Sequence, residues 1–280
     1  MDSNTVLLYN IRVNSKARLK RLSLHLASIC PVSLPPSTPI LINVRGIFKK
    51  SAENLFRLYF KAPILFSLNN DKGWKSDTKY MLSQLTKQWS YVVWMLEDTS
   101  LIYQKGLDLV EILQDAARYQ IEFLPLSQFK SSLIFGADKS AKRVPISNKI
   151  DFYCDTEFID EIAFQTRSKL LRNNWETYPI WAFGIYSQKL FAALLVLPDN
   201  DDQFYTPFGM EVPPPVNSYP SRIGFLKEQL FVTFDDDQGF TGDSLLSRGL
   251  YNDAINQTLL RMQEDYIDSI NCMPTIRNTK

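Results

Sequence analysis

The first hundred residues alternate between apolar runs and amphipathic stretches. The run at residues 5–13 (TVLLYNIRV) is rich in the branched and aromatic side chains that favour a strand. Residues 16–29 follow, with apolar side chains at helical spacing: Leu19, Leu22, Leu26 and Ile29. Further strands are predicted at residues 40–44, 63–68 and 90–96, and further helices at residues 52–60 and 76–89. Non-alternating apolar strands separated by helices predict an α/β protein with a mostly parallel, Rossmann-like central sheet and helices on both faces.

The pattern loosens after residue 99. Helices are predicted at residues 107–119 and 157–171, and an amphipathic helix at residues 255–270 closes the chain. Strands are predicted at residues 121–124, 180–185 and 230–234. A basic loop at residues 139–143 (KSAKR) separates two halves, residues 1–138 and 139–280, which we expect to form one compact domain.

Composition excludes several classes of protein. The 280 residues include 31 Lys and Arg against 30 Asp and Glu, and this balance argues against a nucleic-acid coat protein. Three widely spaced cysteines and one histidine argue against a disulfide framework, a zinc site or a histidine-based triad. His25 lies within a predicted helix and is expected to be a surface or packing residue. Without a secretory signal or an apolar run of membrane length, the chain is expected to be cytoplasmic.

Acidic residues follow the most apolar predicted strand. In parallel sheets, ligands bind beyond the carboxyl ends of the strands, and Glu97 and Asp98 lie at such an end. Adjacent carboxylates can hold Mg²⁺ or Mn²⁺, and these cations leave coordination positions for phosphate oxygens. The acidic pair therefore predicts a divalent-cation site. The alternative is a turn in which one acid caps the backbone and the other is solvated.

The order of these elements resembles the nucleotide-sugar glycosyltransferases of the GT-A fold, in particular bacterial polysaccharide-assembling members. Four strand–helix units, opening with a basic helix (RLKRL at residues 18–22), lead to an acidic motif that reads EDT where the family usually has Asp-any-Asp. Residues 178–195 and 207–211 resemble later segments of the same family. The resemblance implies a donor-binding half at residues 1–138, an acceptor-binding half at residues 139–280 and a divalent cation, Mn²⁺ or Mg²⁺. Thr99 replaces the third acid of the motif.

Glycosyl transfer needs a base for the acceptor hydroxyl and neutralisation of a diphosphate leaving group. Glu211, flanked by Met210 and Val212, is the preferred base because apolar surroundings raise the pKa of a carboxyl group. Asp236, the middle of three consecutive aspartates, is a second catalytic candidate. The alternatives are a charge that anchors the proline-rich loop after Glu211 and a solvated surface turn around Asp236.

Basic and amide side chains near the other strand ends suit the donor. Arg12 and Arg45 are expected to meet the diphosphate, with Asp98, and Asn69 and Asp71 to contact the nucleoside. For Asn69 and Asp71 an ordinary turn is the alternative. The scarcity of glycine, 10 residues, leaves a cation or arginines as the means of holding a diphosphate.

The sequence as a whole thus favours a glycosyltransferase that moves a sugar from a nucleotide-sugar donor to a saccharide acceptor, in surface polysaccharide or glycan synthesis. Two rivals stay open. One is a noncatalytic carbohydrate- or partner-binding protein on a transferase-like scaffold, and the other is a metal phosphotransfer enzyme or nuclease using Asp151, Asp155 and Glu157. We expect no nucleic-acid partner and no transmembrane segment, and peripheral contact with a membrane stays open.

Overall fold

The computed structural model describes residues 4–29, 38–61, 64–67, 74–86, 88–97, 99–101, 109–126, 143–145, 147–153, 183–196, 222–227 and 231–233. The chain divides into two units, Met1–Val232 and Thr233–Lys280. Every element described below lies in the first unit, apart from the last residue of the final strand. The division into a donor half and an acceptor half stays a prediction.

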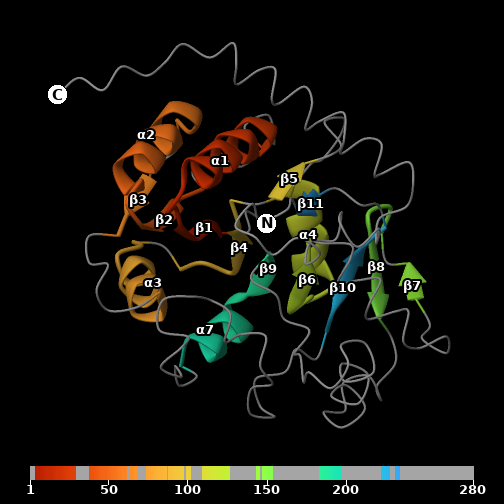
Figure 1. Ribbon diagram of the computed structural model, residues 1–280. Coiled ribbons are helices and arrows are strands. Elements are labelled where there is room, and N and C mark those ends of the chain that lie inside the picture. The colour runs from red at the N-terminus through yellow and green to blue at the C-terminus, as the bar shows by residue number, and fades with distance from the viewer. Residues whose placement is uncertain are drawn as a thin grey trace, which may run out of the picture. The chain divides into compact units, whose positions relative to one another are not determined.

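The centre of the first unit is a six-stranded sheet in the order β3-β2-β1-β4-β9-β6 (Figure 1). The first four strands of this order are mutually parallel, whereas β9 pairs antiparallel with both β4 and β6. The prediction of a mostly parallel α/β sheet is therefore confirmed. The strands are β1 (Thr5–Arg12), β2 (Ile40–Arg45), β3 (Ile64–Phe66), β4 (Tyr91–Met95), β6 (Phe123–Pro125) and β9 (Gly184–Ser187).

Helices cover both faces of the sheet, as predicted. One apolar cluster joins the sheet to α1 (Lys16–Ile29), α2 (Lys49–Tyr59) and α4 (Leu109–Arg118). A second cluster joins the opposite face to α3 (Trp74–Ser83) and α7 (Gln188–Val196). We call these the α1 face and the α3 face.

Two smaller sheets complete the described part of the chain. The first has the order β10-β8-β7, formed by Gly224–Leu226, Ile150–Tyr153 and Arg143–Pro145, and the second pairs β5 (Thr99–Leu101) with β11 (Phe231–Thr233). Arg143, expected in the basic loop, is thus the first residue of a strand. No helix among the described residues is long and apolar enough to cross a membrane.

The structure corrects two predicted helix limits. The prediction that one helix extends to residue 89 is wrong, because α3 ends at Ser83. The next two amides, of Gln84 and Leu85, donate to carbonyls three residues back, and this tighter turn closes the helix. The second correction concerns α2, which begins at Lys49, three residues before its predicted start at residue 52.

Side chains of successive residues in the central strands point to opposite faces. On β1, Leu7, Tyr9 and Ile11 join the cluster under α1, and Val6 and Leu8 join the cluster over α3. Aromatic rings fill both clusters: the Tyr9 and Phe56 ring centroids lie 4.8 Å apart, and those of Trp94 and Phe191 lie 5.7 Å apart. These rings contribute apolar burial to the core, where they are not accessible to a sugar or a base.

Candidate functional site

The α3 face of the sheet becomes polar as its strands approach their carboxyl ends. On β1 the alternate positions read Val6, Leu8, Asn10 and Arg12, and on β2 they read Leu41, Asn43 and Arg45. Register pairs Asn10 with Asn43 and Arg12 with Arg45. Two neighbouring strands therefore present a row of amides followed by a row of guanidinium groups.

The first turns of α3 close over the amides. The Nδ2 atom of Asn10 donates to the Oγ1 atom of Thr78 at 2.9 Å, and that of Asn43 donates to the Oδ2 atom of Asp77 at 3.0 Å. All four side chains are buried. These bonds fix the beginning of α3 against the ends of β1 and β2. The bonded residues are 68 positions apart for Asn10 and Thr78, and 34 positions apart for Asn43 and Asp77.

Two buried oxygens beside these bonds lack a hydrogen-bond partner among the described residues. One is the Oδ1 atom of Asn43, and the other is the Oγ atom of Ser67, the residue after β3. Ser67 is held in place by its own amide, which donates to the carbonyl of Ile42 at 2.9 Å. Buried polar atoms are almost always paired, so an unpaired set at a strand end suits a ligand that completes the bonds.

Arg45 brings positive charge into this buried setting. Its side chain is only 7% exposed, and burial lowers its pKa to about 10, with the nearby Arg12 acting in the same direction. Asp77 and Glu97 act in the opposite direction, so Arg45 has one cation and two acids among its charged neighbours. With this pKa, Arg45 remains a cation at neutral pH. Together with the exposed Arg12, it places two cations at the carboxyl edge of the α3 face, beside the acids Asp77 and Glu97.

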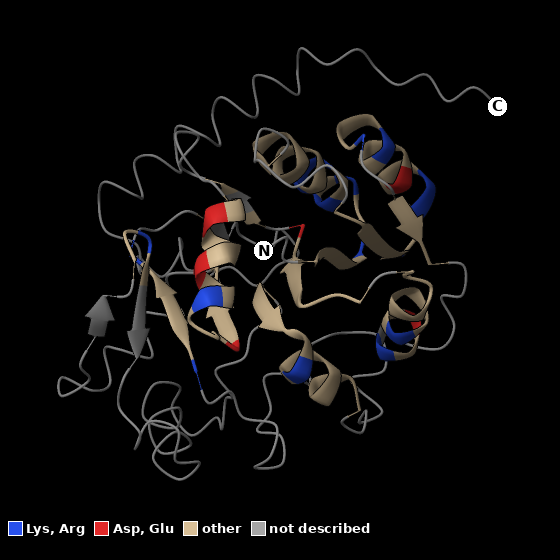
Figure 2. Ribbon diagram, turned by 180° about the vertical axis from the view of Figure 1, so that it is seen from behind, with Lys and Arg blue, Asp and Glu red and all other residues tan. Residues whose placement is uncertain are grey.

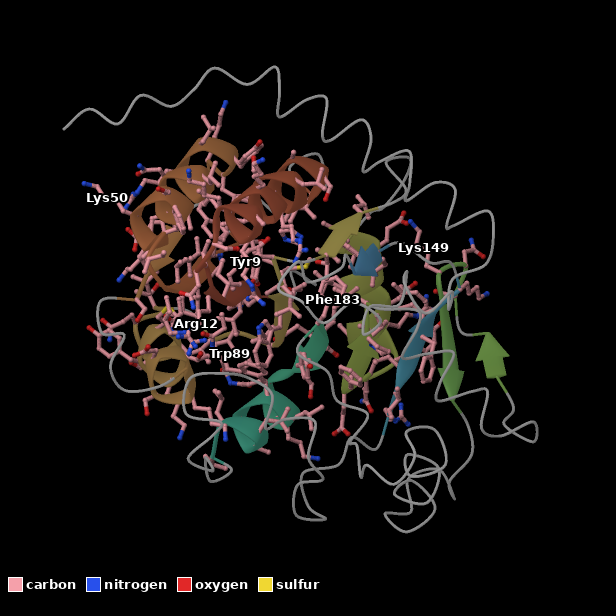
Figure 3. All side chains as sticks on the ribbon, in the orientation of Figure 1. Tyr9, Arg12, Lys50, Trp89, Lys149 and Phe183 are labelled. Atoms are coloured by element: carbon pink, nitrogen blue, oxygen red, sulfur yellow. The ribbon has the colours of Figure 1, made fainter. Side chains whose placement is uncertain are left out.

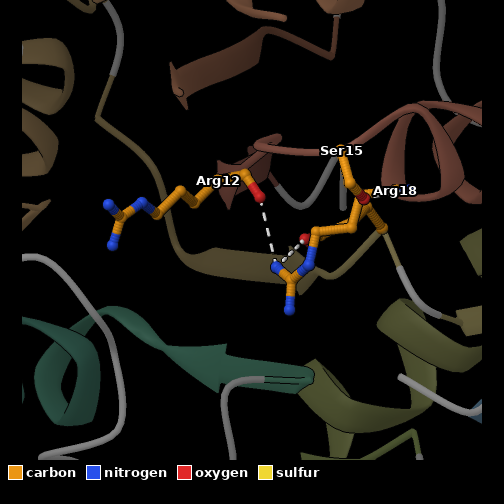
Figure 4. A network of polar contacts seen from close by, with 4 residues as sticks. Arg12, Ser15 and Arg18 are labelled. Carbon is orange, nitrogen blue, oxygen red and sulfur yellow. Dashed lines mark hydrogen bonds and ion pairs between the residues drawn. The ribbon is translucent and has the colours of Figure 1, made fainter. Parts of the chain in front are cut away.

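Glu97, after β4, is engaged by Arg18 from α1. The Nη1 atom of Arg18 donates to the Oε1 atom of Glu97 at 2.9 Å and to the backbone carbonyl of Arg12 at 3.1 Å. Figure 4 shows Arg18 reaching this carbonyl while the side chain of Arg12 extends away. The Ser15 hydroxyl caps α1 by accepting the Arg18 amide at 3.1 Å. Arg18 thus ties the end of β1 to the second residue after β4.

The described residues by themselves do not fit a divalent cation. Among them there is no group of three or more His, Cys, Asp and Glu side chains that could hold a metal. The one described acid of the predicted pair, Glu97, already accepts a charged hydrogen bond, and Arg12 and Arg45 lie nearby. Asp98 lies outside the described residues. The cation at Glu97 and Asp98 therefore stays a prediction.

His25 is a packing residue with specific hydrogen bonds. It is fully buried on α1, its Nε2 atom lies 3.0 Å from the hydroxyl of Tyr9, and its Nδ1 atom lies 2.9 Å from the carbonyl of Thr99. Burial lowers its pKa to about 4, so it is neutral at physiological pH. Through Thr99, His25 connects α1 to the strand that begins two residues after Glu97.

The structure brings together three of the predicted site residues. Arg12 ends β1, Arg45 ends β2 and Glu97 follows β4, all at the carboxyl edge of the sheet. Other predicted residues lie outside the described part of the chain: Asn69, Asp71, Asp98, Glu211, Asp236, and Asp155 and Glu157 of the rival enzyme. Asp151 of that rival set lies in β8.

Sequence reasoning did not single out the amides or the polar residues of α3 as site residues. A signal was present, because Asn10 and Asn43 interrupt the apolar alternation of one face while the opposite face stays apolar. The positions of Ser67, Asp77 and Thr78 carried no such signal. Their importance depends on α3 folding back over the strand ends, a long-range contact.

Comparisons with family models and with curated proteins find no match. Among solved structures, TarS of S. aureus in complex with UDP-GlcNAc is similar over 86% of this chain and 61% of its own, with 12% identity and a TM-score of 0.46. Core-mannan synthase A of Aspergillus fumigatus in its Mn/GDP form is similar over 68% and 60%, with 9% identity and a TM-score of 0.37. The chain thus spans about 60% of the length of either structure. At these values the likeness identifies no function.

Proposed function

We propose that the chain is a glycosyltransferase that moves a sugar from a nucleotide-sugar donor to a saccharide acceptor. The observation that carries this proposal is the register of two amides and two arginines at the carboxyl ends of β1 and β2. β4 lies on the opposite side of β1 from β2, so the strand order reverses beside this row. Ligands of open α/β sheets bind at such a reversal, beyond the carboxyl ends of the strands.

The chemistry of the row matches the parts of a nucleotide sugar. The diphosphate is a compact anion, and guanidinium groups such as those of Arg12 and Arg45 bind phosphate oxygens with two parallel hydrogen bonds. The Asn43 carbonyl oxygen and the Ser67 hydroxyl are buried and lack partners among the described residues. The side-chain oxygen of Asn43 offers the nucleoside a hydrogen-bond acceptor, and the hydroxyl of Ser67 offers it a donor.

The remaining roles are proposals that rest on the sequence. Glu211 is the proposed base, Asp236 a second catalytic residue, and Asn69 and Asp71 nucleoside contacts. A role in polysaccharide synthesis and a cytoplasmic location belong to the same proposal. No step is assigned to a cation, since the described residues do not fit one by themselves.

Calorimetric titration with nucleoside diphosphates and nucleotide sugars tests the proposal. UDP, GDP and UDP-GlcNAc are suitable first probes, each with Mn²⁺ and with EDTA. We expect Arg12→Gln or Arg45→Gln to weaken nucleotide binding at least tenfold, because each removes a charged hydrogen-bond donor, worth about 1.5–3 kcal/mol. The matched control is Lys79→Gln, which removes an exposed cation from α3 and leaves affinity unchanged. The proposal fails if no nucleotide binds at millimolar concentration, or if all three variants bind alike.

Turnover separates the enzyme from the noncatalytic alternative. A transferase releases nucleoside diphosphate from the donor, faster when an acceptor saccharide is present, and loses this activity in Glu211→Gln. A binding protein on the same scaffold binds the nucleotide or a sugar without releasing product, and Glu211→Gln leaves that binding intact.

A further inference from the structure

Charge is distributed very unevenly along this nearly neutral chain. Residues 4–61 contain ten Lys and Arg and a single acid, Glu53, although the whole chain has a net charge of only +1. The ten are Arg12, Lys16, Arg18, Lys20, Arg21, Arg45, Lys49, Lys50, Arg57 and Lys61. Three of them, Arg12, Arg18 and Arg45, belong to the carboxyl edge described above.

The other seven lie on α1 and α2 or directly after α2, and we call them the basic face. Lys16, Lys20, Lys50, Arg57 and Lys61 are exposed, and Arg21 and Lys49 are half-buried. Figure 2 shows Lys and Arg spread over both helices, and Figure 3 shows Lys50 projecting outward from α2. The helices pack side by side, with the Ser23 and Tyr59 hydroxyl oxygens 3.4 Å apart, so their outer surfaces form one continuous layer over the α1 face of the sheet.

Large apolar side chains stand among these cations. Ile47, just before α2, is 82% exposed, and Leu58, near the end of α2, is 74% exposed. Helical spacing places Ser51, Asn54 and Leu58 on one stripe of α2, and Lys50, Asn54 and Arg57 on the adjacent stripe, with Lys61 two residues beyond the end of the helix. The opposite side of α2 is buried through Ala52 and Phe56, so Ile47 and Leu58 contribute nothing to the core.

Cations beside exposed apolar side chains are typical of helices that lie in the interface of a bilayer. There the basic groups meet anionic headgroups while the apolar groups enter the acyl boundary. A soluble polyanion would use the cations but not Ile47 and Leu58. Charge complementarity together with these two side chains therefore favours a lipid surface.

We propose that the basic face docks the protein on an anionic lipid bilayer, with Ile47 and Leu58 inserted among the headgroups. The contact is peripheral and weakens with salt, because most of its attraction comes from exposed charges. This inference does not rest on the proposed function, since it concerns the outer surface of α1 and α2 and not the carboxyl edge of the α3 face.

Sedimentation of the full chain with vesicles tests the proposal. We expect binding to vesicles of phosphatidylcholine with about one-third phosphatidylglycerol, and at least tenfold weaker binding to pure phosphatidylcholine at about 0.1 M salt. Raising the salt to about 0.5 M should remove most of the binding.

Variants of the basic face make the test specific. The double variant Lys50→Glu with Lys61→Glu should bind anionic vesicles at least twentyfold more weakly, since each lysine near such a surface contributes about fivefold. Leu58→Ser should weaken binding severalfold without changing the charge. The matched control is Lys79→Glu on α3, which changes the charge in the same direction and should alter binding less than twofold. Circular dichroism and thermal unfolding show whether each variant keeps its fold.

Three results would overturn the proposal. One is equal binding to neutral and anionic vesicles, and another is an equal loss of binding in the Lys79→Glu control. The third is binding to heparin or DNA with no binding to vesicles, which would assign the basic face to a soluble polyanion. Because nucleotide binding is measured without vesicles, failure here leaves the proposed function standing.

Discussion

The two faces of the central sheet differ most where its strands end. On the α1 face, β1 stays apolar through Tyr9 and Ile11 to Val13, and β2 stays apolar through Ile42 and Val44. On the α3 face, the same strands change to amides and then arginines over the same distance. The α1 face is apolar up to its edge, whereas the α3 face carries polar and charged side chains there.

The difference separates the residues that stabilise the fold from those that we propose to bind the nucleotide. Buried apolar side chains each contribute roughly 1.5–3 kcal/mol of transfer free energy. At the carboxyl edge of the sheet, the α1 face therefore contributes more to the stability of the fold than the α3 face does. Buried amides, hydroxyls and a guanidinium group cost desolvation free energy, which hydrogen bonds offset only in part. The polar residues of the α3 face therefore add less to stability than the apolar residues of the α1 face at the same edge.

The largest predicted effect is a loss of stability when a core residue of the α1 face is truncated. Phe56→Ala should lower the free energy of unfolding by about 3–5 kcal/mol, because a fully buried ring that packs on Tyr9 is replaced by a cavity. Chemical denaturation measures the change. The control on the same helix is Leu58→Ala, whose side chain is 74% exposed and whose loss should change stability by less than about 0.5 kcal/mol. Similar values for the two variants would contradict the placement of Phe56 in the core cluster of this face.

Acid should lower the stability of the fold through His25, which lies on α1 of the same face. Burial lowers the pKa of His25 from 6.5 to about 4, so the unfolded chain binds the proton more readily than the folded chain. The contribution of neutral His25 to the free energy of unfolding is therefore fully present above pH 6.5. It declines as the pH falls towards 4 and is lost below pH 4. The shift corresponds to about 3 kcal/mol.

Unfolding of the native chain and of His25→Gln between pH 7 and pH 4 isolates this contribution. The variant should lose less stability over that range, because its amide does not titrate. Parallel curves for the two proteins would show that His25 does not carry the acid sensitivity.

The loop between β2 and α2, which packs against the connection from β1 to α1, gives an intermediate effect. Gly46 adopts a φ of +101°, and a Cβ atom there would collide with the carbonyl of Val13 and the side chain of Asn14. Gly46→Ala should therefore lower stability by about 2 kcal/mol, through backbone strain and displacement of the two loops. Thermal unfolding measures the loss. Ser51→Ala, on the exposed surface of α2, is a control that should be nearly neutral.

The smallest effect compares two buried serines on opposite faces. Ser28, on α1, donates from its hydroxyl to the carbonyl of His25 at 2.7 Å and accepts the Leu101 amide at 3.1 Å, so Ser28→Ala should cost about 1 kcal/mol. The Ser67 hydroxyl has no partner among the described residues, so Ser67→Ala should leave stability unchanged or slightly higher. We expect it to weaken nucleotide binding about threefold to tenfold. A loss of stability without a loss of binding would contradict this role.

Local patterns predicted much of the fold. The helix at residues 16–29 was predicted with its observed limits from apolar spacing that runs from Leu19 to Ile29, and the structure adds that Ser15 caps it. The end of α3 was not predicted, because the apolar pattern continues past Ser83 into turns, where Trp89 packs edge-to-face on Phe191, 6.3 Å away. Nor could the sequence show that β9 pairs between β4 and β6, since strand order depends on contacts between distant segments.

The sequence alone determined the class of fold, the strand ends that carry Arg12, Arg45 and Glu97, and the charge of the first two helices. These follow from periodicity and from neighbours along the chain, which act at short range. Only the tertiary structure decided that Arg18 holds Glu97, 79 residues away, and that α3 closes over Asn10 and Asn43. The physical reason is that burial and charge pairing are set by which surfaces meet, and a local pattern does not specify the partner.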